Sequence, residues 1–221
     1  MSLIIQAAPK SKPAPKPELP KSNNEIEVDV PDGESGSWKI DTVVVTREEA
    51  AIENMHMARY GRYVPPGVYK RLKRDGNTIM SNTPDEIQDH RTMFYQAKDS
   101  GGSVLINGLG LGVALKKVLS FENVTDVTVV ELSEDVISLV SPYYKDERLT
   151  IVHASAYDYK PPKGKRYNVV WHDIWDNICS DNLPEMHKLH RKYGRRSDWQ
   201  GSWCRGECEY QRDQTNRSYW G

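Results

Sequence analysis

The sequence has few cysteines, no excess of charge of either sign and no long apolar run. Its 221 residues carry 30 lysines and arginines, 31 acidic residues and three cysteines, for a net charge of −1. No apolar segment reaches the roughly 18 residues of a membrane span, and the N-terminus lacks the apolar core of a signal peptide. Three cysteines cannot all pair within one chain, so we expect reduced thiols and a cytoplasmic location. The balanced charge disfavours nucleic acid and membrane surfaces as partners.

Several nucleotide-binding motifs are also missing. The sequence G-x-x-x-x-G-K-[ST] does not occur, which excludes a P-loop. The dinucleotide fingerprint G-x-G-x-x-G/A requires a small residue where this chain has Val113 or Leu115, which disfavours NAD and FAD. No DPPY, NPPF or PC motif is present, so extrusion and methylation of a nucleic-acid base is unsupported.

The most informative segment is a glycine-rich turn that follows a predicted buried strand. Gly108, Gly110 and Gly112 alternate with leucines, and the next predicted strand ends in Glu131. Glycines allow the backbone to approach a ligand at the mouth of a sheet, where a side chain would collide. A carboxylate at the end of the following strand can accept hydrogen bonds from both hydroxyls of a ribose. The segment therefore predicts a nucleotide-binding βαβ unit.

The N-terminal part divides into a tail and a small structured region. Residues 1–36 are rich in proline, lysine, alanine, serine and glutamate, which predicts a disordered tail. For residues 37–82 we predict a strand at 38–45, a helix from the Thr46–Glu49 capping box to about residue 60, and a hairpin of strands 68–74 and 78–81.

Residues 83–221 are predicted to form a Rossmann-like α/β domain. A helix is expected from the Thr83 cap to about Ala97. Predicted strands at 103–107, 126–131, 149–153 and 167–173 alternate with helices at 111–120 and 133–143. This alternation predicts a parallel sheet of order 3-2-1-4 with both faces covered. Beyond it we predict two C-terminal helices, at 181–193 and 199–212, and no further strand. The exposed sheet edge would be covered by these helices or by a second subunit in a homodimer.

The glycine turn and its surroundings resemble a known group of transferases. The pattern G-x-G-x-G after a strand, with an acid ending the next strand, resembles class I S-adenosylmethionine (SAM) methyltransferases and the related spermidine synthases. The similarity to spermidine synthases covers about Tyr69 to Trp175. Four segments carry it: DGNTIMSNTPDEIQDH at 75–90, VTVVELSEDVI at 127–137, LTIVHASAYDY at 149–159 and VVWHDIWD at 169–176. A full class I core has three more strands than the four predicted, so the core is interpreted as abbreviated.

The resemblance implies roles for particular residues. It places Asp85, Glu86 and His90 in matching positions of the first segment. It implies that the methionine part of SAM is held by Gly108, Leu109, Gly110 and Gly112, the ribose by Glu131, and the adenine by Leu132, Ser155 and Ala156, with Trp175 stacking on the adenine or covering the sheet edge. Asp173 would contact the cofactor and act as the catalytic residue, with His172 and Asp176 as weaker candidates.

Four positions depart from the aminopropyltransferase pattern. Leu111 replaces an aspartate between the last two glycines, Met80 replaces a glutamine, Asp89 a tyrosine, and Ser155 an acid that contacts adenine. The loss of groups that would hold an amine argues against polyamine synthesis. The sequence therefore predicts a SAM-dependent methyltransferase with a small-molecule or protein acceptor. An aminopropyltransferase and a non-catalytic nucleoside-binding module are the alternatives.

A set of two histidines and two cysteines offers potential zinc ligands. His187, His190, Cys204 and Cys208 form the pattern H-x2-H…C-x3-C. Both pairs fall within predicted helices, where cysteines at i and i+4 also suit a buried apolar face. We favour this second interpretation and predict no metal site.

Overall fold

The N-terminal region forms a small antiparallel sheet with one helix. The computed structural model describes residues 25–57 and 62–220. The strands β1 (Gly33–Ser35), β2 (Trp38–Val45), β3 (Gly67–Arg74) and β4 (Asn77–Ser81) pair in that order, and α1 (Arg47–Met57) follows β2. The predicted strand and hairpin are confirmed, as is the helix up to Met57; its predicted end near residue 60 lies outside the described residues. The predicted capping box forms as well, since the Thr46 N–H donates to Glu49 Oε2 at 2.9 Å and the Glu49 N–H donates to Thr46 Oγ1 at 3.2 Å.

The segment just before β1 is part of the folded core. Ile26, Val28 and Val30 are buried, while the residues between them are exposed. The three side chains join the cluster that packs on the parallel sheet, and Lys117 of the next region pairs with Glu25 at 2.8 Å. The predicted tail is therefore wrong for residues 25–36, because an alternating apolar pattern here covers a neighbouring surface. Residues 1–24 lie outside the described part of the chain.

The remaining residues form an α/β unit around a five-stranded parallel sheet. Its strands are β5 (Gly102–Asn107), β6 (Val124–Glu131), β7 (Leu149–His153), β8 (Tyr167–His172) and β9 (Ser197–Ser202), and their order is β7-β6-β5-β8-β9. The helices are α2 (Pro84–Asp89), α3 (Arg91–Ser100), α4 (Val113–Leu119), α5 (Glu134–Val140), α6 (Leu183–Tyr193) and α7 (Arg205–Trp220), with short 3-10 helices at Ser141–Tyr143 and Ser180–Asn182. The Rossmann-like fold and the order of its first four strands are confirmed.

The fifth strand corrects the prediction that only helices follow Asp173. β9 has the polar sequence SDWQGS and pairs in parallel with β8, from Tyr167 opposite Ser197 to His172 opposite Ser202. It lacks an apolar run because it is an edge strand whose middle residues are only half-buried. The last predicted helix accordingly begins at Arg205 instead of Trp199.

A second correction concerns the helix predicted from Thr83. It is interrupted at His90, which separates α2 from α3. The Thr83 side chain does not cap α2, because its hydroxyl lies 2.7 Å from that of Ser81. Glu86 Oε2 instead accepts the backbone N–H of Ser81 at 2.6 Å, which ties α2 to the end of β4.

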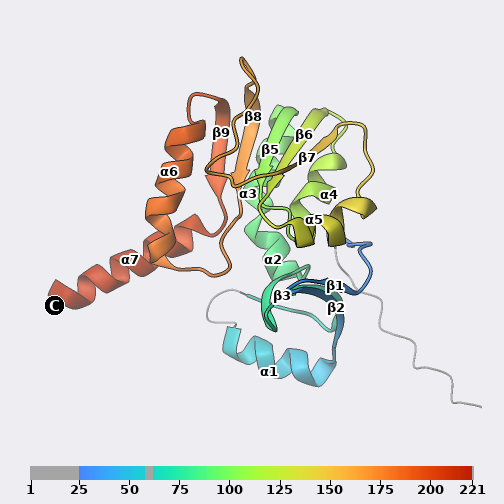
Figure 1. The fold of residues 1–221 in the computed structure, drawn as a ribbon. Helices are drawn as coiled ribbons and strands as arrows, with labels where there is room; N and C mark the ends of the chain where they lie inside the picture. Colours follow the sequence, from blue (N-terminus) through green and yellow to red (C-terminus); the bar gives the residue numbers. More distant parts are fainter. Residues whose placement is uncertain (1–24, 58–61, 221) are drawn as a thin grey trace, which may run out of the picture.

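The parallel sheet is covered on both faces. The cluster on one face includes Val104 and Ile106 of β5 and side chains of α3, α4 and α5. The other face, which includes Leu105, packs against α6. A fully buried side chain of this size contributes roughly 1.5–3 kcal/mol, so β5 is a stable platform for the turn that follows it. Figure 1 shows the antiparallel sheet below the parallel one, with α1 beneath it.

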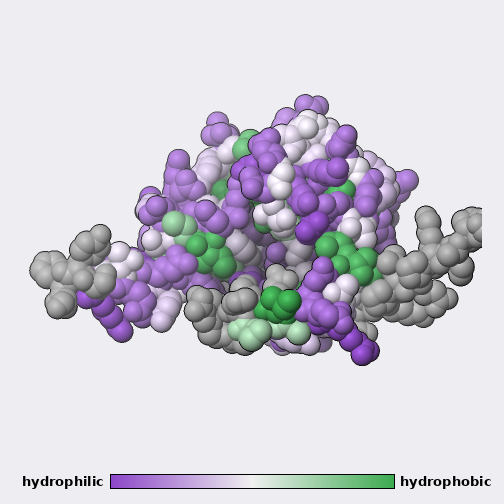
Figure 2. All heavy atoms as spheres, turned by 90° about the horizontal axis from the view of Figure 1, so that it is seen from below, coloured by the Kyte–Doolittle hydropathy of each residue, from purple (hydrophilic) through white to green (hydrophobic). Residues whose placement is uncertain are grey.

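The outer face of the N-terminal region mixes polar and apolar side chains. Seen from below, its apolar side chains form separate patches between hydrophilic ones (Figure 2). Ile52 and Met55 of α1 are among the exposed apolar residues. Within the described residues, no helix combines the length and the apolar character that a membrane span requires.

Candidate functional site

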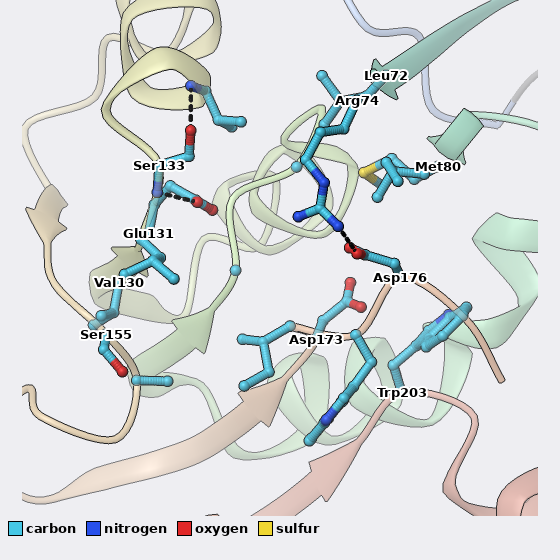
Figure 3. A pocket seen from close by; sticks show the side chains of 18 of the residues that line it. Leu72, Arg74, Met80, Val130, Glu131, Ser133, Ser155, Asp173, Asp176 and Trp203 are labelled. Atoms are coloured by element: carbon cyan, nitrogen blue, oxygen red, sulfur yellow. Dashed lines mark hydrogen bonds and ion pairs between the residues drawn. The ribbon is translucent and has the colours of Figure 1, made fainter. Parts of the chain in front are cut away.

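A cavity of about 440 Å³ lies between the carboxyl ends of β5, β6, β7 and β8 and the N-terminal sheet (Figure 3). Such an edge is where ligands bind in parallel α/β sheets. Eight of the ten predicted ligand-binding residues line it: Gly108, Gly110, Glu131, Leu132, Ser155, Ala156, Asp173 and Trp175. Leu109 and Gly112 do not line the cavity. The fold thus brings together residues from the ends of four strands, β5, β6, β7 and β8.

The three glycines of the turn all have positive φ angles, of 101°, 50° and 77°. Their absent β-carbons make room for protein groups. A β-carbon on Gly108 would collide with the backbone carbonyl of Asp173, and one on Gly110 with the sulfur of Met80. Met80 Sδ also lies 3.1 Å from the N–H of Leu111. The turn is therefore fixed by tight packing against β8 and the hairpin.

Gly112 has a structural environment that sequence reasoning did not anticipate. It packs against the ring of Tyr144, whose hydroxyl donates to the carbonyl of Leu111 at 2.8 Å. Gly112 is the N-cap residue of α4 and adopts the left-handed conformation. The ring of Tyr144 therefore occupies the space that a side chain at this position would need.

Glu131 is held at the end of β6 by two backbone amides. Its Oε2 accepts the N–H of Leu109 at 2.8 Å, and its Oε1 accepts the N–H of Ser133 at 2.7 Å. Each carboxylate oxygen can accept a further hydrogen bond. The oriented acid therefore fits a vicinal diol such as that of a ribose. Leu109 takes part through its amide alone, since its side chain is buried in the core.

Asp173 and His90 form the most strongly perturbed pair at the site. His90 Nε2 lies 3.8 Å from Asp173 Oδ2, and the side chains are 2% and 21% exposed. Burial, together with the charges of Asp89 and Glu131, raises the pKa of Asp173 to about 7. Burial lowers the pKa of His90 to about 4, so the imidazole is neutral at pH 7. A carboxyl with this pKa can accept a proton near neutral pH.

The opposite end of the cavity is lined by Trp175, Ser155 and a carboxylate that the sequence did not single out. Trp175 Nε1 donates to Glu185 Oε2 at 2.8 Å, and the Tyr157 hydroxyl donates to the same oxygen at 3.2 Å. Ser155 Oγ accepts the N–H of Tyr157 at 3.1 Å. Glu185 lies in the first turn of α6, where an acid is common for its effect on the helix dipole. No sequence signal therefore distinguished it.

The N-terminal region supplies the remaining wall. Trp38, Arg74 and Met80 line the cavity from β2, β3 and β4. Arg74 is ion-paired with Asp176, so the hairpin is joined to the loop after β8 (Figure 3). Glu86 of α2 also lines the cavity, and burial together with the charges of Asp85 and Asp89 raises its pKa to about 8, against the opposing effect of the Ser81 hydrogen bond.

Other candidates from the sequence lie elsewhere. His172 is buried away from the cavity, with Nδ1 2.8 Å from Asn107 Nδ2 and Nε2 3.3 Å from Gln200 Oε1. The two histidines and two cysteines that offer potential zinc ligands form no cluster among the described residues. His190 Nε2 contacts the Ser202 hydroxyl at 2.9 Å, whereas Cys208 is in the core beneath α6. The described residues contain no group of three or more metal-ligating side chains.

Comparison with known proteins supports the resemblance noted in the sequence. A polyamine aminopropyltransferase of Oceanobacillus iheyensis is 27% identical over 135 residues, which are 55% of this chain and 25% of that protein. The chain thus spans about a quarter of the length of this curated relative. No protein-family model matches.

Solved structures similar to this chain include enzymes of both expected kinds. The spermidine synthase of Thermotoga maritima is 19% identical, with a TM-score of 0.46 over 76% of this chain and 52% of that one. The Escherichia coli protein described as "Putative methyltransferase yhhF" is also 19% identical, with a TM-score of 0.39 over 48% of this chain and 60% of that one.

Proposed function

We propose that this chain is a SAM-dependent methyltransferase that acts on a small-molecule or protein acceptor. The observation that carries the proposal is the position of Glu131. Its carboxylate is oriented by two backbone amides and lines a cavity at the carboxyl ends of the central strands. Asp173, with its raised pKa, lines the same cavity.

The residues of the cavity would divide the work of the reaction. When bound, SAM supplies an electrophilic methyl group on a sulfonium. Glu131 would hold the ribose, while Ser155 and Trp175 would form the adenine end. Asp173 would accept the proton that the acceptor atom loses. In-line methyl transfer depends mainly on alignment, so an enclosed site with one positioned base is chemically sufficient.

Isothermal titration calorimetry with SAM, its demethylated product and NAD tests the proposal. We expect the two sulfur nucleosides to bind and NAD not to bind. Glu131→Ala should weaken binding at least tenfold, because a charge-assisted contact to the ribose is lost. Glu134→Ala is the matched control, since Glu134 is exposed on the next helix and does not line the cavity. Equal binding by both variants would refute the assignment of the ribose site.

An aminopropyltransferase is the second candidate. The aminopropyltransferase match covers more than half of this chain, and the N-terminal hairpin encloses the cavity. Incubation with decarboxylated SAM and putrescine distinguishes the two activities, because formation of spermidine would reverse their order. A non-catalytic binding module would bind SAM without methyl turnover when it is offered a cell extract as a source of acceptors.

The oligomeric state is a separate prediction. β7 and β9 are the edge strands of the parallel sheet, and an edge can be covered by a second subunit. We keep the homodimer as a proposal that sedimentation equilibrium tests directly. A monomer at tens of micromolar would exclude it.

A further inference from the structure

The charges that line the cavity are strongly unequal. Five acidic side chains line it, those of Glu86, Glu131, Asp173, Asp176 and Glu185, of which Glu86, with its pKa near 8, is protonated at neutral pH. Among the described residues that line the cavity, Arg74 is the single arginine, and none is a lysine. A ligand with a carboxylate of its own would meet acidic groups, and no other guanidinium or ammonium group, on most of this wall. It would have one cationic partner available.

Arg74 is oriented from two sides. Its guanidinium carbon lies 5.2 Å from the centre of the Trp38 ring, and its Nη2 donates to Asp176 Oδ2. Stacking on an aromatic ring and one ion pair restrict the planar group without using all its donors. Nη1 and Nε make no hydrogen bond with any of the described residues. The side chain is 43% exposed, so a ligand entering the cavity can reach it.

We propose that Arg74 binds the carboxylate of the ligand's amino-acid tail and thereby selects SAM over decarboxylated SAM. The inference rests on the proposed function, because it concerns the same nucleoside site. A guanidinium matches a carboxylate through two parallel N–H donors, a geometry that an ammonium group cannot provide. The acids around Arg74 suit the ammonium group of the same tail. Recognition of a zwitterion thus follows from the arrangement of charges.

The alternative role for Arg74 is purely mechanical. Its ion pair with Asp176 joins the hairpin to the loop after β8 and could serve only to close the cavity. The two roles differ in what they predict for ligands. A latch affects all nucleosides alike, whereas a carboxylate receptor affects only the nucleoside that carries a carboxylate.

Calorimetric titration of Arg74→Met with SAM and with decarboxylated SAM separates the two roles. These ligands differ only in the carboxylate. We expect SAM binding to weaken about tenfold and binding of decarboxylated SAM to change less than twofold. Arg71→Met is the matched control, because Arg71 lies on the same strand and pairs with Asp41 outside the cavity. It should leave both affinities unchanged.

The other outcomes are equally decisive. Equal weakening of both ligands, or no change in either, would overturn the proposal while leaving the nucleoside site intact. Failure of the unsubstituted chain to bind either ligand would refute the proposed function itself. If Arg74→Met does not fold, as judged by thermal unfolding, Arg74→Lys provides the same comparison. That variant keeps the charge but loses the planar fork, so the ratio of the two affinities should still shift toward decarboxylated SAM.

Discussion

Replacement of Glu86 by glutamine should stabilise the protein, and the gain should grow with pH. Glu86 is held between the end of β4 and the cavity, where its Oε2 accepts the Ser81 N–H. Burial first, and then the charges of Asp85 and Asp89, raise its pKa from 4.5 to about 8. Glutamine keeps a carbonyl oxygen for Ser81 and carries no charge. The substitution therefore removes a buried ionisation with little change in shape.

The sign follows from proton binding by the two states. Between pH 4.5 and 8 the folded chain keeps a proton on Glu86 that the unfolded chain has lost, so its contribution to stability falls as pH rises. The upper limit is roughly 5 kcal/mol above pH 8, because each tenfold change in proton affinity is worth about 1.4 kcal/mol. Water in the cavity can solvate the carboxylate, so we expect a measured gain of about 2–4 kcal/mol.

Urea denaturation at a series of pH values from 4 to 9 measures this effect. The free energies of unfolding of Glu86→Gln and the unsubstituted chain should coincide near pH 4 and diverge up to pH 8. Other titrating groups such as His90 contribute equally to both chains and cancel. Glu34→Gln, at a side chain that is 77% exposed, is the control. Parallel curves for Glu86→Gln across the whole range would show that the buried carboxyl is not perturbed.

Three further predictions concern the reacting carboxylate, the glycine turn and the N-terminal segment. Asp173→Asn should lower methyl transfer at least ~100-fold while leaving SAM affinity within threefold, and the rise of kcat/KM with pH through about 7 should disappear. Gly108→Ala should lower the free energy of unfolding in urea by ~3 kcal/mol or more, because the new methyl group meets a backbone carbonyl. Gly76 also has a positive φ but lies in open space, so Gly76→Ala should lower it by about 1 kcal/mol. Val30→Ala should cost roughly 1–3 kcal/mol, whereas Glu27→Ala on the exposed side should cost under about 0.5 kcal/mol. Equal effects within either of these last two pairs would refute the packing described for that segment.

Local patterns made the centre of the site predictable. The strand, the glycine turn and Glu131 are close in sequence, and the hydrogen bond between Leu109 and Glu131 spans only 22 residues. The capping box at Thr46 formed as expected for the same reason, since all its partners lie within one helical turn. Short apolar runs that alternate with helical segments also indicated the first four parallel strands.

Polar and weakly patterned segments misled the prediction. β9 has no apolar run because an edge strand buries only part of each side chain, and its backbone pairing with β8 supplies the order. Residues 26, 28 and 30 are apolar in a segment whose composition suggests disorder. Alternating apolar residues in so short a segment become buried only where a neighbouring surface packs against them.

The sequence by itself determined a parallel α/β core with a glycine turn and an acid at its carboxyl edge, because those features depend on neighbours along the chain. The tertiary structure alone decided what encloses that edge. Arg74 and Trp38 line the cavity because the N-terminal sheet packs over it, and Glu185 lines it from a helix more than 50 residues after Glu131 in the chain. Contacts between residues so distant in sequence leave no local pattern. The charged groups that would determine ligand specificity could therefore be identified only in the folded structure.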